Sequence, residues 1–331
     1  MTLMPDSAES AGLDSADSSC EERTVKQLLL MAGQALKARG ADADEARLES
    51  ELLLLEMTGK SRAWLRAFDD TRLSLEVQHR FEQLLQRRLS GEPLAYILGR
   101  KDFWSLELYV TDAVLIPRED TEVLVTQALQ LGRQLEIETG QTVLDVLELG
   151  TGSGAIICAL ATEETLWQFT ATDVSAEALA VATTNVTGHG FAGQTTLLLG
   201  SWFDALENGM AASHESAAPR FDLIISNPPY IAEGDPHLDA PALRHEPALA
   251  LSSGTDGLDS IRHIVAAASR WLQPTGWLLL EHGYDQGPAV RKLMRQAGYE
   301  NVATALDLAG QPRVTMARHS VAAVQIAGAA K

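Results

Sequence analysis

The chain has 331 residues, of which 46% are hydrophobic and 21% are charged, ordinary values for a globular protein that exclude a disordered or fibrous chain. The formal net charge is -19 at pH 7, and because so acidic a surface repels phosphate backbones, bulk DNA is a disfavoured partner. No apolar run approaches the roughly 18 residues of a membrane span, and two cysteines are too few for a disulfide framework or a cysteine-rich zinc site.

The first hundred residues divide into a polar tail and a helical segment. Residues 1–22 are rich in Ser, Asp and Glu and lack the features of a secretion signal, which predicts a disordered tail on a cytoplasmic protein. Residues 23–99 carry apolar side chains at the spacing of amphipathic helices; the clearest runs are Val25, Leu28, Leu29, Ala32 and Leu36, and then Leu48, Leu52 and Leu55. We expect a small helical domain that recognises the substrate or covers a site, with structural support as an alternative.

A change of pattern separates this segment from the rest of the chain. Residues 100–117 alternate bulky and polar side chains around Thr111 and Asp112, which predicts a β-hairpin linking two domains. Residues 118–320 alternate strand-like and helical segments, and residues 321–331 are expected to form a flexible tail. The expected strands lie at 143–149, 169–173, 195–199, 221–226 and 277–281. This alternation predicts an α/β fold with a doubly wound, mostly parallel sheet covered by helices on both faces.

A glycine-rich turn follows the first expected strand and opens a helix. It reads Glu148-Leu149-Gly150-Thr151-Gly152-Ser153-Gly154, and glycines there let the backbone pass close to a ligand. Asp173 follows this turn at a separation close to the roughly 20 residues expected for an acid that binds a ribose. The turn and Asp173 alone suit NAD and S-adenosylmethionine equally. Glu148 is placed to bind the ammonium of a methionine moiety through water, an interaction that has no counterpart in NAD.

The expected strand at 221–226 delivers Asn227-Pro228-Pro229-Tyr230 to the edge of the sheet where ligands bind. The two prolines fix their φ angles and lack N–H donors. A planar nitrogen with two hydrogens can donate one to the Asn227 oxygen and one to the Pro228 carbonyl, while Tyr230 packs on its flat face. Positioning and electrostatics then align the nitrogen behind the methyl of a sulfonium, without a metal or a covalent intermediate. We therefore expect a methyltransferase that acts on a planar amide or amine nitrogen.

From about Thr24 onward the sequence resembles the glutamine methyltransferases of peptide chain release factors, the PrmC or HemK family. The motifs that carry the resemblance are Gly91–Gly99, Phe103-Trp104, Leu115–Arg118, Glu148–Gly154, Asn227–Tyr230, Arg244–Pro247 and Leu280–Gly283. The family more often has a proline after Pro117-Arg118, where this chain has Glu119. This departure puts the stiffness of the local turn in question, and it does not touch the chemistry.

The resemblance implies a class I, Rossmann-like methyltransferase that uses S-adenosyl-L-methionine to methylate the glutamine amide in the Gly-Gly-Gln motif of bacterial release factors. It implies that Gly150, Thr151, Gly152, Ser153 and Gly154 hold the cofactor. By the same resemblance Asp173 binds the ribose, Trp202 stacks near the adenine, Phe103 reaches the cofactor from the linker, and Asn227 borders it. The glutamine is clasped by Asn227, Pro228, Pro229 and Tyr230.

Two other functions remain open from the residues. An amino methyltransferase acting on adenine or guanine of nucleic acid would meet the same two hydrogens after base flipping, although the acidic charge disfavours stable nucleic acid binding. A non-catalytic binding module on the same scaffold is the other. We expect a monomer, with residues 231–257 as a substrate-side loop whose His237 and His245 serve surface or packing roles.

Overall fold

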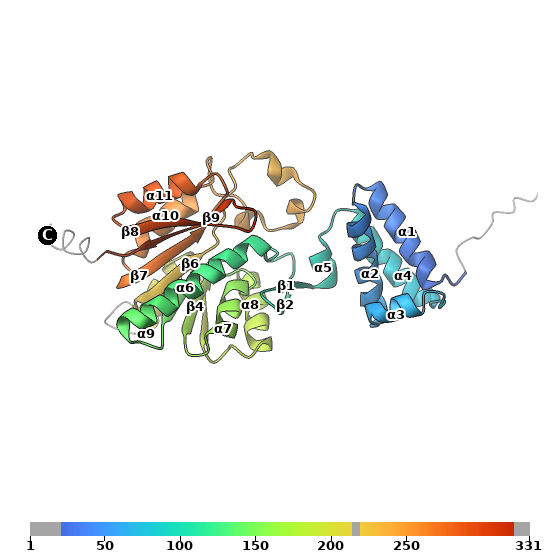
Figure 1. Cartoon of the computed structure of the whole chain (residues 1–331), viewed down its shortest axis with the longest axis horizontal. Coiled ribbons are helices and arrows are strands. Elements are labelled where there is room, and N and C mark those ends of the chain that lie inside the picture. The colour runs from blue at the N-terminus through green and yellow to red at the C-terminus, as the bar shows by residue number, and fades with distance from the viewer. Residues whose placement is uncertain (1–20, 214–218, 321–331) are drawn as a thin grey trace, which may run out of the picture. The chain divides into compact units, whose positions relative to one another are not determined.

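The computed structural model describes residues 21–213 and 219–320 (Figure 1). Nearly all of the expected amino-terminal tail and the whole of the expected carboxyl-terminal tail lie outside these ranges. The contacts within the chain divide it into two compact units, and the boundary between them along the sequence lies after Gly91. The helical domain expected from the sequence runs further, to residue 99. In the described ranges, no helix has both the length and the apolar character needed to cross a membrane.

From residue 21 onward, the first unit is a bundle of four helices. These are α1 (Val25–Ala38), α2 (Ala43–Thr58), α3 (Arg62–Ala67) and α4 (Leu75–Leu89). The buried face of α2 differs from the expected stripe of Leu48, Leu52 and Leu55: Leu48 is 41% exposed, and the buried positions are Ala46, Glu49, Ser50, Leu53 and Leu54. A glutamate is tolerated in this core because the Arg88 guanidinium donates to both of its carboxylate oxygens, at 2.9 and 3.0 Å.

The second unit begins with the short helix α5 (Leu94–Leu98) and an antiparallel hairpin. Strands β1 (Arg100–Phe103) and β2 (Leu106–Tyr109) pair directly. The hairpin was expected around Thr111 and Asp112, but the structure turns at Trp104 and Ser105, which both have positive φ angles. Tertiary hydrogen bonds hold this unusual turn, because the Trp104 backbone N–H donates to Glu122 at 3.1 Å and its indole N–H donates to Glu163 at 3.0 Å.

A seven-stranded sheet with the order β5-β4-β3-β6-β7-β9-β8 forms the centre of the second unit. Strands β3 to β7 are parallel, and β9 is antiparallel to both of its neighbours. The strands are β3 (Asp145–Leu149), β4 (Gln168–Asp173), β5 (Thr195–Leu199), β6 (Phe221–Ser226), β7 (Leu272–Glu281), β8 (Glu300–Leu306) and β9 (Pro312–Arg318). The predicted doubly wound, mostly parallel sheet is confirmed.

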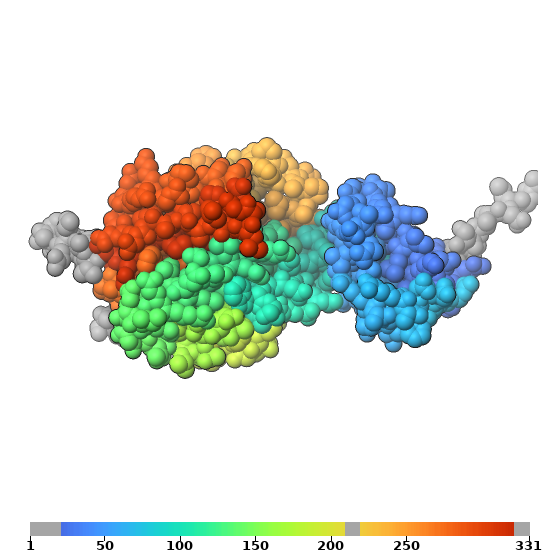
Figure 2. All heavy atoms as spheres, viewed as in Figure 1, coloured from blue at the N-terminus to red at the C-terminus, as the bar shows by residue number. Residues whose placement is uncertain are grey.

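Helices cover both faces of this sheet with separate apolar cores. The first core lies under α6 (Glu122–Thr139), α7 (Ala155–Glu163) and the end of α8 (Ala176–Gly188); the second lies under α9 (Asp204–Ser213), α10 (Asp259–Ala268) and α11 (Gly287–Gln296). On the surface, α6 adjoins the strand pair β8–β9 (Figure 2), where an ion pair joins Glu138 to Arg318. This layering leaves the strand ends free for a site.

Helix α6 contacts the fully buried Trp167 through a glycine. A Cβ added at Gly132 would lie 2.1 Å from the Trp167 ring. We expect Gly132→Ala to lower the free energy of unfolding by about 2 kcal/mol, because the overpacking outweighs the gain of about 1 kcal/mol in helix propensity. Gly188→Ala in α8 is the matched control: its Cβ would meet no atom within 4 Å, so the change should stabilise the protein slightly. Urea denaturation measures both, and a Gly132→Ala variant as stable as the parent would contradict this packing.

Candidate active site

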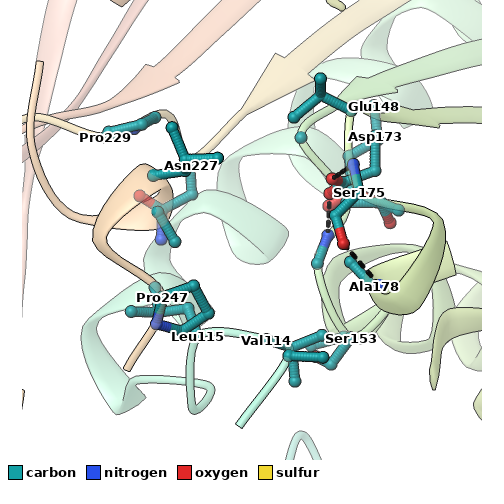
Figure 3. A pocket seen from close by; sticks show the side chains of 18 of the residues that line it. Val114, Leu115, Glu148, Ser153, Asp173, Ser175, Ala178, Asn227, Pro229 and Pro247 are labelled. Atoms are coloured by element: carbon teal, nitrogen blue, oxygen red, sulfur yellow. Dashed lines mark hydrogen bonds between the residues drawn. The ribbon is translucent and has the colours of Figure 1, made fainter. Parts of the chain in front are cut away.

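A cavity of about 650 Å³ opens where β3, β4 and β6 end (Figure 3). Strand β3 is the switch point of the sheet, because β4 and β6 pair on its opposite sides, and such a crevice is the usual ligand site of a doubly wound fold. In Figure 3 Asn227 lies across the cavity from Glu148 and Asp173. Residues far apart in the sequence therefore converge on one cavity.

The glycine turn adopts the backbone that only glycine takes readily. Gly150, Gly152 and Gly154 have φ angles of 72°, 55° and 78°. The backbone N–H groups of Gly150 and Thr151 donate to the Thr172 carbonyl at 2.9 and 3.0 Å, which ties the turn to β4. Gly150, Thr151, Gly152 and Ser153 line the cavity. Gly154 instead packs against α8, where an added Cβ would lie 3.3 Å from that of Ala182.

Two carboxyl groups face the cavity behind this turn. The Asp173 carboxylate accepts the N–H groups of Gly152 at 2.8 Å and Ser175 at 2.9 Å. Glu148 is buried and accepts the Thr151 hydroxyl at 2.6 Å. Burial raises the pKa of Glu148 to about 8, with a smaller contribution from the nearby charge of Asp173. The ligand-free cavity therefore holds a largely neutral Glu148 beside Asp173 at pH 7.

The residues present fit S-adenosylmethionine. A cationic amino-acid end suits the buried, proton-binding Glu148, since a positive neighbour favours the ionised carboxylate. Asp173, at the end of β4, offers carboxylate oxygens of the kind that accept vicinal hydroxyls. Trp202 also lines the cavity, with a φ angle of 46° that is rare for a bulky residue. Trp202 and the two acids thus line one cavity, and their roles toward the cofactor stay predictions.

The Asn-Pro-Pro-Tyr turn leaves β6 and brings only part of itself to the cavity. Asn227 and Pro229 line it, whereas Pro228 is buried and the Tyr230 side chain is not part of the lining. Asn227 Nδ2 donates to Thr121 Oγ1 at 3.2 Å, and the Tyr230 hydroxyl points to Glu281 at 3.4 Å. Burial raises the pKa of Tyr230. In this conformation Tyr230 supports the turn from behind.

Phe103, like Gly154, is an expected cofactor contact that is not among the residues lining the cavity. Its side chain is 3% exposed and belongs to the core under α6 and α7, together with Leu124 and Ile156. The reason is the position of the hairpin turn, because pairing of Phe103 with Leu106 places Phe103 at the last strand position, before the turn at Trp104 and Ser105. Phe103 therefore packs in the core under α6 and α7.

Sequence reasoning missed an ion pair that closes one wall of the cavity. The buried Glu246 carboxylate pairs with Arg118, which lines the cavity, and also accepts the Ile116 backbone N–H at 3.1 Å. It thereby joins the segment after the hairpin to the loop at 231–257, whose Pro247 and Leu249 line the cavity. Both partners stood in the motifs quoted above, but no sequence spacing indicates that residues 128 positions apart are paired.

Removing the cation of this pair leaves a buried carboxylate uncompensated. We expect Arg118→Ala to lower the free energy of unfolding by about 2 kcal/mol, less than for a fully buried pair because Arg118 is 38% exposed. Glu246→Gln together with Arg118→Ala removes both charges and should cost less than the sum of the single changes. Denaturant titration of the three variants checks this double-mutant cycle. Strict additivity would show that the two side chains are not coupled.

The histidines of the loop take no part in the cavity. His237 is 83% exposed and pairs with Asp235 at 2.7 Å, and His245 is exposed. Within residues 21–213 and 219–320, no group of three His, Cys, Asp or Glu side chains has the arrangement of a metal site. Glu119, which stands where the family more often has proline, begins the 3₁₀ helix η1 (Glu119–Thr121), and this helix delivers Thr121 to Asn227.

A doubly wound sheet of this order, with an acidic pair behind its glycine turn and an asparagine opposite, defines a class I methyltransferase that uses S-adenosylmethionine. A crystal structure of the hMettl16 catalytic domain in complex with MAT2A 3'UTR hairpin 1 has the same fold, with a TM-score of 0.50 and 18% identity, covering 71% of this chain and 80% of that one. At that identity the likeness concerns the fold alone.

Two family models match this chain, the PrmC N-terminal domain at residues 27–99 and the methyltransferase small domain at residues 120–242. A release factor glutamine methyltransferase of Xylella fastidiosa (strain Temecula1) is 46% identical over 272 residues, covering 82% of this chain and 93% of the relative. One of Shewanella oneidensis is 42% identical over 278 residues, covering 84% and 91%. The chain belongs to the release factor glutamine methyltransferase family, and it is an S-adenosylmethionine-dependent enzyme.

Proposed function

We propose that this protein transfers a methyl group from S-adenosylmethionine to the side-chain amide nitrogen of the glutamine in the Gly-Gly-Gln motif of peptide chain release factors. Membership of the family supports the release factor as substrate. The observation that carries the proposal is the position of Asn227 across one cavity from Glu148 and Asp173, because a methyl donor and a planar amide must meet between such groups.

On the cofactor side, the chain's own residues bind and orient. Glu148 holds the ammonium end, Asp173 holds the ribose hydroxyls, and Trp202 packs on the adenine. The backbone of Gly150 to Gly154 lets the ligand approach, since each of the three glycines has a positive φ angle. S-adenosylmethionine supplies, when bound, an electrophilic methyl on a sulfonium. Val114, Leu115 and Ile156 line the same cavity and would help to exclude water from it.

On the substrate side, Asn227 and the Pro228 carbonyl accept the two hydrogens of the glutamine amide. An amide nitrogen is a poor nucleophile because its lone pair is delocalised into the carbonyl. Two acceptors held at fixed positions orient that nitrogen and stabilise the positive charge that develops on it during transfer. Pro229 lines the cavity beside Asn227, and Tyr230, whose hydroxyl points to Glu281, supports the turn that carries both residues.

The expected partner chemistry follows from the charge. With a net charge of -19 the protein suits a basic protein surface, and we propose that it acts as a cytoplasmic monomer without stable nucleic acid binding. Complex formation with a release factor should weaken as salt is added. Sedimentation at increasing salt measures both the association with release factor and the oligomeric state of the enzyme alone. An affinity that does not change with salt would contradict the charge argument.

Mass spectrometry of the Gly-Gly-Gln peptide tests the activity itself. Purified release factor is incubated with the enzyme and isotopically labelled cofactor, and the peptide is compared with one from a reaction without enzyme. We expect a gain of a single methyl group on the glutamine. Parallel reactions contain nucleic acid in place of release factor, and label found in nucleic acid alone would overturn the proposal.

A further inference from the structure

The turn between β8 and β9 carries a leucine that is fully exposed, Leu308. The turn around it is closely bonded: Asp307 Oδ1 accepts the backbone N–H groups of Ala309 at 3.0 Å and Gln311 at 2.8 Å. The Gly310 N–H donates to the Asp307 carbonyl at 2.9 Å, and the φ angle of 79° at Gly310 suits glycine. A single exposed leucine needs no explanation, but this one is held in a fixed place by a turn with its own side-chain cap.

A salt bridge ties this turn to the wall of the cavity. The Arg313 guanidinium pairs with Asp307 at 3.0 Å and with Asp120 at 2.9 Å. Asp120 belongs to η1, and the next residue, Thr121, lines the cavity. The side chains of Arg313 and Asp307 are 13% and 2% exposed, so solvent screens their pairing little. The position of Leu308 is therefore set relative to the cavity.

The register of the sheet places the β8–β9 turn at the edge where the cavity opens. Strand β9 begins beside the end of β7, because Val314 pairs with Glu281. The end of β7 in turn lies beside the end of β6, because Leu280 pairs with Ser226, the residue before the Asn-Pro-Pro-Tyr turn. The β8–β9 turn and the loop at 231–257 therefore lie at the same end of the sheet (Figure 1).

Two more exposed apolar side chains lie in loops that leave this edge. Leu249, in the loop after β6, lines the cavity, and Tyr284 lies in the segment that follows β7. That segment is tied to the substrate turn, because Gln286 Nε2 donates to the Tyr230 carbonyl at 2.9 Å. The strands that these loops follow are neighbours in the order β6-β7-β9-β8. Leu249, Tyr284 and Leu308, which we call the apolar rim, thus extend outward from the cavity along one edge of the sheet.

Carboxylates border the apolar rim. Asp285 is exposed next to Tyr284, and Glu119 and Asp120 are exposed on η1. Arg313, the cation beside them, is largely covered and pairs with two carboxylates. Protein interfaces commonly have an apolar centre with a polar border, and opposite charges across that border favour association. The apolar rim therefore suits a partner surface that combines apolar side chains with basic groups.

We propose that the apolar rim is a docking surface for the folded part of the release factor beside its Gly-Gly-Gln loop. The inference rests on the proposed function, in which the glutamine enters the cavity that Leu249 lines. A folded partner that inserts one side chain brings the surface around that side chain against the edge of the cavity. Leu308 is already held in place, so its burial costs little conformational entropy. It therefore acts as an anchor of the complex.

Calorimetry of the enzyme with purified release factor tests the docking surface without catalysis. Leu308→Ser should raise the Kd for release factor about tenfold, as for an interface anchor, and Tyr284→Ser should have a similar effect. Leu308→Met keeps an apolar side chain and should stay within about threefold of the parent. Leu166→Ser is the matched control, because Leu166 is also exposed but precedes β4, at the opposite edge of the sheet. A Kd for Leu308→Ser within about twofold of the parent would overturn the inference, and so would an equal rise in Leu166→Ser.

Kinetics and sedimentation then separate docking from the alternatives. Leu308→Ser should raise KM for release factor about tenfold and keep kcat within about twofold of the parent. A fall in kcat with unchanged KM would place Leu308 in the chemical step instead. Self-association of the enzyme alone that Leu308→Ser abolishes would assign the apolar rim to a second copy of this chain, which also overturns the inference. An enzyme that binds release factor through Leu308 but methylates none would refute the proposed function alone.

Discussion

Asn227→Ala should lower kcat for methyl transfer by roughly a thousandfold, while the Kd for S-adenosylmethionine changes by no more than about threefold. The reason is that in the proposed function the Asn227 oxygen accepts a hydrogen of the nucleophilic nitrogen, and such an acceptor is worth several kcal/mol when charge develops. Single-turnover kinetics measures the rate of transfer with release factor, and calorimetry measures cofactor affinity without it. The pattern expected is a loss in the chemical step with binding retained.

A matched control is available on the surface. Asn208→Ala changes an exposed asparagine on α9 and should leave both kcat and Kd unchanged. If Asn227→Ala retained near-parent activity, the turn would have a structural role only. If instead the cofactor no longer bound, Asn227 would belong mainly to the cofactor half of the cavity.

Binding of S-adenosylmethionine near pH 7 should release close to one proton from the protein. Glu148 is mostly protonated in the ligand-free enzyme because burial raises its pKa to about 8, and the bound ammonium favours the ionised form. Calorimetry in two buffers of different ionisation enthalpy measures the proton count. The release should disappear above about pH 9, where the carboxyl is already ionised before the ligand binds.

Glu148→Gln should abolish this proton release and weaken cofactor binding by roughly tenfold to a hundredfold, the loss of a charge-assisted contact. Glu177→Gln is the control, since Glu177 also lines the cavity but has a lowered pKa and is already ionised at neutral pH. A Glu148→Gln variant that still released the proton would assign the titration to another group.

The same carboxyl makes the ligand-free protein sensitive to pH. A raised folded-state pKa means that the folded protein binds this proton more tightly than the unfolded chain, so stability is lost as the pH rises from about 4.5 toward 8. Bound cofactor should weaken this dependence, because its ammonium favours the ionised form of Glu148. Glu148→Gln should flatten the slope for the ligand-free protein across that range in denaturant titrations.

The parallel part of the fold was predictable, because each buried strand reads as a short apolar run with a turn after it. The antiparallel strands β8 and β9 and the helix α6 were not predicted. β8 is mostly exposed and mixed in character, and α6 combines a glycine with a long polar face. In α2 the wrong face was chosen because a run of four leucines satisfies two helical stripes equally. The pairing of Glu49 with Arg88, which decides between them, joins positions 39 residues apart.

Most of the residues that line the cavity were expected, because they follow the ends of strands in the sequence and their side-chain chemistry can be recognised there. Glu148, Asp173, Trp202 and Asn227 all line it, although their individual roles stay predictions. The contacts that depend on tertiary structure could not be predicted from the sequence. Phe103 turned into the core because of its place in the hairpin, and Tyr230 faced Glu281. Thr121 ends the 3₁₀ helix η1 and Glu246 lies in the loop at 231–257, and the positions of both depend on the whole sheet.

The hydrogen bonds and ion pairs around the cavity also differ in the sequence separation of the two residues that they join. The cofactor side depends on near neighbours: Thr151 bonds Glu148 three positions away, and Gly152 bonds Asp173 at a separation of 21. The substrate side depends on contacts at separations of 106 for Thr121 with Asn227 and 128 for Arg118 with Glu246. Long closures cost more entropy and form later during folding. We therefore expect a chain that is partly unfolded, or still being synthesised, to acquire the cofactor half of its cavity before the substrate half.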